Sequence, residues 1–331
     1  MDEYLTITMR FDLMVPDFAP VPARDYYVAC LEMCDWAEQH DLGFIVFSEH
    51  HGVDNGWLPA PLTMAGVVAG RTERLNITAA ATLVTLHDPV RLAEQLAVLD
   101  LASGGRVSIV AGIGYRPEEF AMAGVDKSRR GRILEEKLQV MLKAWTGEPF
   151  EWDGRTIRVT PKPFTQPHPL VMVGGSSELA VRRAARMGLP FFAADVDERF
   201  DEWYAEEAAA HNQEGGFVIQ PHGSTFVFVT DDVDRTWEEI GPYLLHEAQM
   251  YDSFQVEEQA SAVHVSGAET VDDVRATGAY SVVTPDEAVA LAKEAGPAGA
   301  FVLNPLSAGI PPELGWRSLE LTAAEVLPRL S

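Results

Sequence analysis

The chain has 331 residues, and 47% of them are hydrophobic, so it can bury a sizeable core and wholesale disorder is excluded. Its 50 acidic and 25 basic residues give a formal net charge of -25, which repels phosphate backbones and anionic lipid and argues against nucleic acid or a membrane as partner. The two cysteines are too few for a disulfide scaffold, the N-terminus lacks the basic start of a signal peptide, and no apolar run reaches the ~18 residues of a transmembrane helix, so we expect a cytoplasmic protein.

Short apolar runs alternate with longer helical stretches through the first half of the chain. In chain order, the pattern predicts a strand at 5–15, a helix at 24–40, a strand at 44–47, a helix at 59–71, a strand at 75–83, a helix at 89–103, a strand at 107–111 and a helix at 128–145. The helix at 89–103 is the most sharply bounded, because Pro89 opens it and Gly104 follows it.

The segment 147–169 interrupts this alternation. It contains five prolines between 149 and 169, and residues 150–159 read as a hairpin around Asp153-Gly154, so we interpret it as an insertion over the surface. The alternation then resumes with strands at 170–173, 190–194, 225–229 and 301–303 and helices at 178–187, 199–214, 234–251, 285–295 and 312–330. The polar stretch 255–279 is interpreted as a second insertion.

Eight strands, each followed by a helix, predict a closed (β/α)8 barrel of the TIM type, formed by residues 1–331 as a single domain with insertions after strands 4 and 7. The alternative is an open doubly wound sheet, which favours a glycine-rich phosphate turn after the first strand. Residues 15–20 read Val-Pro-Asp-Phe-Ala-Pro and cannot make that turn, so the barrel is favoured.

In such a barrel, chemistry is expected at the carboxyl ends of the strands and in the loops that follow them. This rule selects Glu49-His50-His51 after strand 2, residues 78–82 on strand 3, residues 112–116 after strand 4, residues 174–177 after strand 5, Asp195 at the end of strand 6 and Asn304 at the end of strand 8.

The pair His50-His51 could suggest a metal site. Consecutive residues that leave a strand point to opposite sides, however, and strand 1 carries no histidine, so we predict no metal. One inward histidine is then expected to donate or accept a proton, with a histidine bonded to loop backbone as the alternative for each position.

The run Gly174-Gly175-Ser176-Ser177 follows a strand and opens a helix, where free backbone N–H groups and the helix dipole suit a phosphate. The same residues could cap the helix without a ligand, and spacing alone leaves both interpretations open. The run Ala79-Ala80-Ala81 leaves room for something flat at the rim, although close packing against a helix would also explain it.

Together, the segments 44–51, 75–81, 87–95 and 99–106 resemble the luciferase-like flavin-dependent oxidoreductases, the relatives of the bacterial luciferase subunits. Residues 188–190 and 326–328 also fit, and the resemblance extends over almost the whole chain. It implies FMN, or alternatively coenzyme F420, bound across the barrel mouth above strand 3. It also implies a non-proline cis peptide at Ala80-Ala81 and a homodimer.

The resemblance also assigns roles to residues. His50 matches the family's active-site histidine, with Tyr115 and Asp195 as further catalytic candidates that would hydrogen-bond substrate. The expected cofactor-binding residues are Glu49, Ala80, Ala81, Gly112, Gly175, Ser176 and Ser177. The chain departs from bacterial luciferase at Ile113, where that enzyme has a phosphate-holding arginine, and at Ser176-Ser177, which replace an acidic-serine pair. These departures argue against light emission and leave both cofactors open.

We therefore expect a monooxygenase that uses reduced FMN and O2 on a small organic substrate, with the reduced flavin supplied by a separate reductase. The first alternative is F420-dependent hydride transfer, and the second is a flavin-binding protein without turnover. Metal-dependent hydrolysis is disfavoured because strand 1 lacks histidines.

Overall fold

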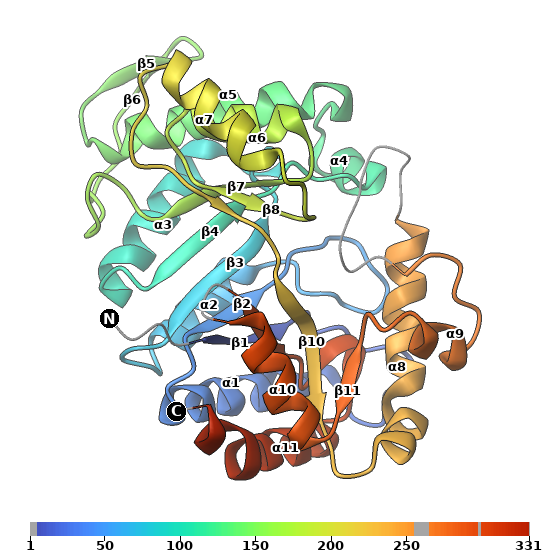
Figure 1. The fold of residues 1–331 in the computed structure, drawn as a ribbon. Coiled ribbons are helices and arrows are strands. Elements are labelled where there is room, and N and C mark those ends of the chain that lie inside the picture. Colours follow the sequence, from blue (N-terminus) through green and yellow to red (C-terminus); the bar gives the residue numbers. More distant parts are fainter. Residues whose placement is uncertain (1–4, 255–264, 297–298, 331) are drawn as a thin grey trace. The chain divides into compact units, whose positions relative to one another are not determined.

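The computed structural model describes residues 5–254, 265–296 and 299–330 (Figure 1). The chain forms two compact units. The first unit comprises Met1–Val46, Val53–Pro59 and Pro221–Ser331, and the second comprises Phe47–Gly52 and Ala60–Gln220.

The first unit holds five strands in the order β11, β10, β12, β1, β2. Their bounds are β1 Thr6–Phe11, β2 Phe44–Phe47, β10 Gly223–Val229, β11 Ser281–Val283 and β12 Ala300–Leu303. The pairs β1–β12, β10–β11 and β10–β12 are parallel. The helices are α1 Ala23–Gln39, α8 Val233–Ser253, α9 Val271–Ala276, α10 Pro285–Ala295 and α11 Pro312–Leu321, with α1 packed on α11 and α8 on α9.

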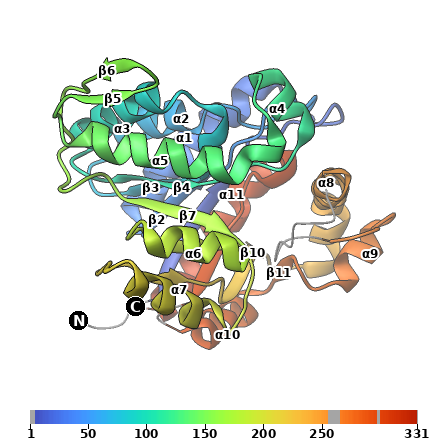
Figure 2. The same cartoon turned by 90° about the horizontal axis from the view of Figure 1, so that it is seen from above.

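The parallel sheet of the second unit has the strand order β3, β4, β7, β8, β9. Their bounds are β3 Asn76–Thr82, β4 Val107–Ala111, β7 Val171–Gly175, β8 Phe191–Ala193 and β9 Val218–Ile219. The helices are α2 Pro61–Ala69, α3 Pro89–Ser103, α4 Pro117–Ala123, α5 Arg130–Trp145, α6 Glu178–Arg186 and α7 Phe200–Ala210. Figure 2 shows α5, α6 and α7 side by side, and α6 packs on α7 while α3 packs on α5.

Local sequence explains where these helices begin and end. The Asp88 side chain accepts the N–H groups of Val90 and Arg91 at the start of α3, and Gly104 ends the helix at φ 67°. In β4, all five residues of Val107–Ala111 are buried, as an apolar strand covered on both faces requires. The core of the second unit is formed by α3, α5 and α6 against β4 and β7, with Leu96, Leu138 and Val181 among its members.

The predicted α/β architecture of parallel strands and helical crossovers is confirmed, as is the hairpin in the first insertion, formed by β5 Phe150–Trp152 and β6 Arg155–Ile157. The first strand was predicted too long, because residues 12–15 form a loop after β1. The elements α4, α9, β9 and β11 were not predicted. Part of the second predicted insertion, residues 255–264, lies outside the described residues, and the single-domain prediction stays a prediction. In the part of the chain that the structure describes, no helix combines the length and apolarity needed to cross a membrane.

Candidate active site

Three loops of the second unit bring the candidate site together. They are the segment that follows β2, the segment between β3 and α3, and the segment from the end of β4 into α4. Because β3 and β4 are parallel neighbours, their carboxyl ends open at the same edge. Charged and titratable side chains from all three loops therefore meet in one buried network.

The central contact of this network joins His50 to Glu119. The His50 Nδ1 atom lies 2.9 Å from Oε1 of Glu119, and the two side chains are 8% and 0% exposed. The same carboxylate oxygen accepts the backbone N–H of His51 at 3.0 Å. Glu119 lies in the first turn of α4, so this short helix positions the acceptor beneath the histidine.

The protonation state of Glu119 fixes which nitrogen of His50 carries a hydrogen. Burial raises the pKa of the Glu119 carboxyl, but the hydrogen bonds from His50 and from the backbone of His51 and the charge of Arg116 outweigh that effect, so the net pKa is below its ordinary value. An ionised carboxylate only accepts hydrogen bonds, so Nδ1 of His50 must donate. In the neutral imidazole, Nε2 is then the basic nitrogen.

Two neighbours complete the surroundings of His50. The Tyr115 hydroxyl lies 3.4 Å from Nε2 of His50, with the two rings edge to face at 78°. Arg116, buried to 6% exposure, donates from one terminal nitrogen to the His51 carbonyl at 2.7 Å and approaches Oε1 of Glu119 at 3.4 Å. Oε2 of Glu119 has no hydrogen-bond partner among the described residues.

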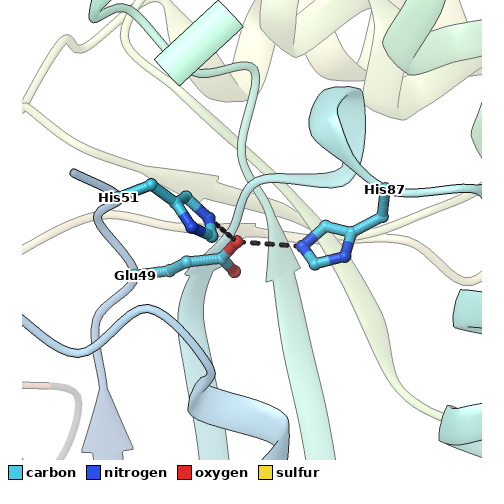
Figure 3. A group of neighbouring side chains, drawn as sticks. All are labelled: Glu49, His51 and His87. Carbon is cyan, nitrogen blue, oxygen red and sulfur yellow. Dashed lines mark hydrogen bonds and ion pairs between the residues drawn. The ribbon is translucent and has the colours of Figure 1, made fainter. Parts of the chain in front are cut away.

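A second carboxylate, Glu49, joins two further histidines (Figure 3). Oε1 of Glu49 accepts Nε2–H of His51 at 2.8 Å and Nε2–H of His87 at 2.9 Å, while Oε2 accepts the backbone N–H of Leu83 at 3.1 Å. Figure 3 shows the carboxylate between the two imidazoles, one from the segment after β2 and one from the segment after β3. Glu49 thus ties these two loops together.

The hydrogen bonds of this cluster favour an ionised Glu49 and a protonated His51. Burial raises the pKa of Glu49, but the hydrogen bonds from His51 and His87 more than offset that effect, and the net pKa is lowered. The hydrogen bond to Glu49 raises the pKa of His51. One oxygen and two imidazole nitrogens within 4.8 Å of one another form a set that could hold a divalent ion. Here both imidazole nitrogens are hydrogen-bonded to the same Glu49 oxygen. The absence of a metal stays a prediction.

The backbone of β3 has the expected conformation at Ala80 and Ala81. The peptide bond between Ala80 and Ala81 is cis, as the resemblance implied. Both alanines are partly exposed at the end of β3. A Cβ added at Gly112 would lie 2.7 Å from Cβ of Ala81, so glycine at 112 is needed for close packing against that bond.

The remaining predicted residues lie at the ends of β7 and β8. Gly175 ends β7, and a Cβ there would meet that of Ala180 at 2.6 Å, so this glycine lets α6 pack on the strand. The Ser177 side chain is the N-cap of α6 and accepts the N–H of Ala180. Ser176, between them, is half-buried. Asp195 follows β8, and its carboxylate accepts the N–H of Val196.

The structure brings three of the predicted residues, Glu49, His50 and Tyr115, into one network. The partners Glu119, Arg116 and His87 were not predicted as site residues. Nothing local indicates that the Glu119 carboxylate would reach His50, which lies 69 positions away.

Known proteins of similar sequence include flavin-dependent monooxygenases. The model of the luciferase-like monooxygenase family matches residues 9–299. The alkanal monooxygenase beta chain of Photorhabdus laumondii is 28% identical over 210 residues, covering 61% of this chain and 65% of that protein. The FMNH2-dependent dimethylsulfone monooxygenase of Pseudomonas putida is 30% identical over 174 residues, covering 50% and 44%. The chain thus spans about half the length of several curated relatives it matches.

Solved structures share the fold over nearly the whole chain. A monooxygenase from Streptomyces bottropensis superposes with a TM-score of 0.78 at 20% identity, covering 99% of this chain and 100% of the other. The oxygenating component of 3,6-diketocamphane monooxygenase from Pseudomonas putida, solved with FMN, gives 0.73 at 19% identity over 98% of each. An F420-dependent secondary alcohol dehydrogenase gives 0.66 at 16% identity over 99% of each.

Proposed function

Because the chain belongs to the luciferase-like monooxygenase family, we propose that it is a flavin-dependent monooxygenase that uses reduced FMN and O2 on a small organic substrate. The observation that carries this proposal is the buried pair of His50 and Glu119 in the second unit. Such a pair holds an imidazole in one tautomer and orientation, which a proton-transfer step requires.

In this proposal, His50 holds or moves a proton at Nε2 while Glu119 keeps Nδ1 protonated. Glu119 also stabilises the imidazolium that forms when Nε2 takes up a proton. Tyr115 lies at hydrogen-bond range of the same nitrogen and can hold a substrate oxygen beside it. Glu49 has both oxygens bonded to protein donors, so it holds the two loops together, and its contact with the cofactor stays a prediction.

Two features of the second unit fit a flavin with a phosphate tail. Ala80 and Ala81 present only methyl groups at the partly exposed end of β3, where a flat ring would rest. The N-terminus of α6, with Ser176 and Ser177 before it, suits the phosphate. When bound, reduced flavin supplies the electrons that activate oxygen.

Separate titrations with FMN and with coenzyme F420 test this assignment. We expect FMN to bind with a dissociation constant in the micromolar range, measured by the quenching of flavin fluorescence. Oxygen uptake in the presence of reduced FMN and candidate substrates then separates a monooxygenase from a protein that binds flavin without turnover. Binding of neither cofactor would overturn the proposed function.

A second candidate is hydride transfer with F420, which the similarity to an F420-dependent alcohol dehydrogenase supports. In that reaction, His50 would donate a proton to the substrate oxygen or accept one from it. F420 binding without oxygen consumption would select this alternative.

We further propose that a separate reductase supplies reduced flavin, since no nicotinamide-binding turn follows the first strand. The proposal includes a homodimer in the cytoplasm, which the family resemblance and the acidic composition support. Light scattering on the purified chain measures the oligomeric state directly.

A further inference from the structure

The guanidinium of Arg183 on α6, in the second unit, is a buried cation that its surroundings do not fully compensate. Arg183 is only 9% exposed, and its Nε has no hydrogen-bond partner among the described residues. The acidic group beside it is Glu135, at 3.8 Å from Nε, which is too far for a hydrogen bond. Burial lowers the pKa of Arg183, and Glu135 reverses only part of that effect.

The nearby carboxylates are committed to other cations. Glu135 binds Arg186 through both oxygens, at 3.2 and 3.4 Å. Glu136 accepts Nε–H of Arg132 at 2.7 Å. Arg182, which neighbours Arg183 on the same helix, shows the contrast, since it pairs with Glu178, Glu206 and Glu207 at distances of 2.7 to 3.5 Å.

The guanidinium of Arg183 lies against the beginning of α5. A Cβ added at Gly131 would come within 2.8 Å of a terminal nitrogen of Arg183, so glycine at this position makes room for the cation. The same Cβ would lie 3.8 Å from the side chain of Ile113, which follows β4 and offers no charge. A cavity of about 390 Å³ is lined by Gly131, Arg132, Glu135, Glu136, Gln139 and Arg183.

Helix dipoles add to the positive potential at this place. The 16-residue helix α5 has no acidic residue in its first turn, although a 3-10 turn at Lys127–Arg129 runs into it and is capped by Asp126. Arg183 is six residues past the N-cap Ser177 of α6, and side chains on a helix lean toward its N-terminus. The guanidinium is therefore carried back toward the first turn of α6, on the side that faces the start of α5.

We propose that Arg183 binds the phosphate of the cofactor, between the first turns of α5 and α6. This inference rests on the proposed function and adds to it the cation that pairs with the phosphate. A phosphate dianion would satisfy the unpartnered Nε and a terminal nitrogen together, as the planar guanidinium fork allows. Ser176 and Ser177 would contact the same group from the start of α6.

The test compares FMN with riboflavin, which has the same ring system and no phosphate. Dissociation constants of both are measured for the wild-type chain, Arg183→Met, Arg183→Lys and the matched control Arg182→Met. If F420 is the cofactor that binds, F420 and its phosphate-free deazaflavin precursor replace the pair. Circular dichroism confirms that each variant is folded, and Arg183→Lys keeps the test informative if Arg183→Met does not fold.

We expect Arg183→Met to weaken FMN binding by about 10- to 100-fold, the range for losing a charged hydrogen-bond partner, and to leave riboflavin binding unchanged. Arg183→Lys recovers part of the loss, and Arg182→Met leaves the ratio of the two constants as in the wild type. Equal weakening of FMN and riboflavin, or unchanged FMN binding, would overturn the role of Arg183 while the proposed function stands. A wild-type chain that binds no flavin or deazaflavin would refute the proposed function, and the assignment of Arg183 with it.

Discussion

A histidine serves best as an acid or base when a hydrogen bond fixes one ring nitrogen and the other ring nitrogen faces the reacting group. In this chain the holding group is Glu119, whose carboxylate is 0% exposed and accepts Nδ1–H of His50. A buried carboxylate is costly unless it is compensated, and here the backbone N–H of His51 and the guanidinium of Arg116 share that task. The orientation of His50 thus depends on three other residues, His51 beside it and Arg116 and Glu119 at the start of α4.

Replacement of His50 tests whether this orientation serves catalysis. We expect His50→Ala to lower the turnover rate by about 100-fold or more, the range for losing a positioned acid or base, with the dissociation constant of the cofactor changed only a few-fold. Steady-state kinetics and fluorescence titration measure the two quantities. The exposed His211→Ala serves as the control and should alter neither. An unchanged turnover rate for His50→Ala would remove His50 from the mechanism.

At the scale of residues, the sequence indicates which residues belong to the site better than it indicates which residues they contact. The motif Glu49-His50-His51 and the cis bond at Ala80-Ala81 could be placed from the resemblance, because each belongs to a short continuous segment. Arg183 could have been noticed, since it lies on the buried stripe of α6 that also carries Ala180 and Ala184, where an arginine is unusual. Its approach to Gly131, on another helix, follows only from tertiary packing.

Single side chains also join whole elements, and Arg106 is the clearest case. It follows the glycines that end α3, and it donates to the carbonyls of Ala69, Thr72, Leu75 and Ser103 at 2.8 to 2.9 Å. Ala69 is the last residue of α2, where the helix dipole favours a cation, and Thr72 lies three residues beyond it. One guanidinium thus fastens the carboxyl ends of α2 and α3 to the start of β3.

Because this clamp uses the branched shape of the guanidinium, lysine should not replace it. We expect Arg106→Lys to lower the free energy of unfolding by about 2 kcal/mol, since several buried carbonyls lose their donor. Urea denaturation measures the change. The matched control is Arg91→Lys, an exposed residue of α3 paired with Glu94, for which we expect a change within about 0.5 kcal/mol. A similar small value for Arg106→Lys would show that water replaces the lost contacts.

Elements were predictable where local signals bound them. The helix α3 has a capping aspartate, a proline at its start and a left-handed glycine after its end, and its predicted limits agree with those observed. The elements that were missed are short: α4 has seven residues, α9 six, β9 two and β11 three. Such segments carry too few residues for a periodic pattern, and they form because neighbouring elements bind them.

On the scale of the whole molecule, each compact unit has a network of charged and hydrogen-bonded side chains among its described buried residues. In the second unit it is the site around His50 and Glu119. In the first unit, Asp12 accepts the N–H groups of Met14 and Ala308, and the Ser307 hydroxyl lies 3.0 Å from Asp12 and 3.3 Å from Glu247. The network of the first unit places the carboxyl groups of Asp12 and Glu247 close together. We therefore expect the stability of the chain to depend on pH.

Glu247 gives the clearest prediction for stability. Its side chain is fully buried in α8, where burial and then the charge of Asp12 raise its pKa to about 7, against the lowering effects of Arg10, Tyr280 and Ser307. In the unfolded chain its pKa returns to about 4.5. The folded state therefore binds the extra proton, and stability falls as pH rises from the unfolded pKa to the folded one, by on the order of 3 kcal/mol.

The substitution Glu247→Gln keeps the size of the side chain and removes its titration. Relative to the wild type, we expect a higher melting temperature at about pH 8, where wild-type Glu247 is ionised, and little difference at about pH 5, where it is protonated. Differential scanning calorimetry at both pH values measures this, with the exposed Glu202→Gln of α7 as control, which should shift the melting temperature equally at both. A Glu247→Gln effect that is the same at both pH values would mean that Glu247 keeps its ordinary pKa because Arg10 compensates its charge completely, and a larger effect at the acidic pH would equally contradict a raised pKa.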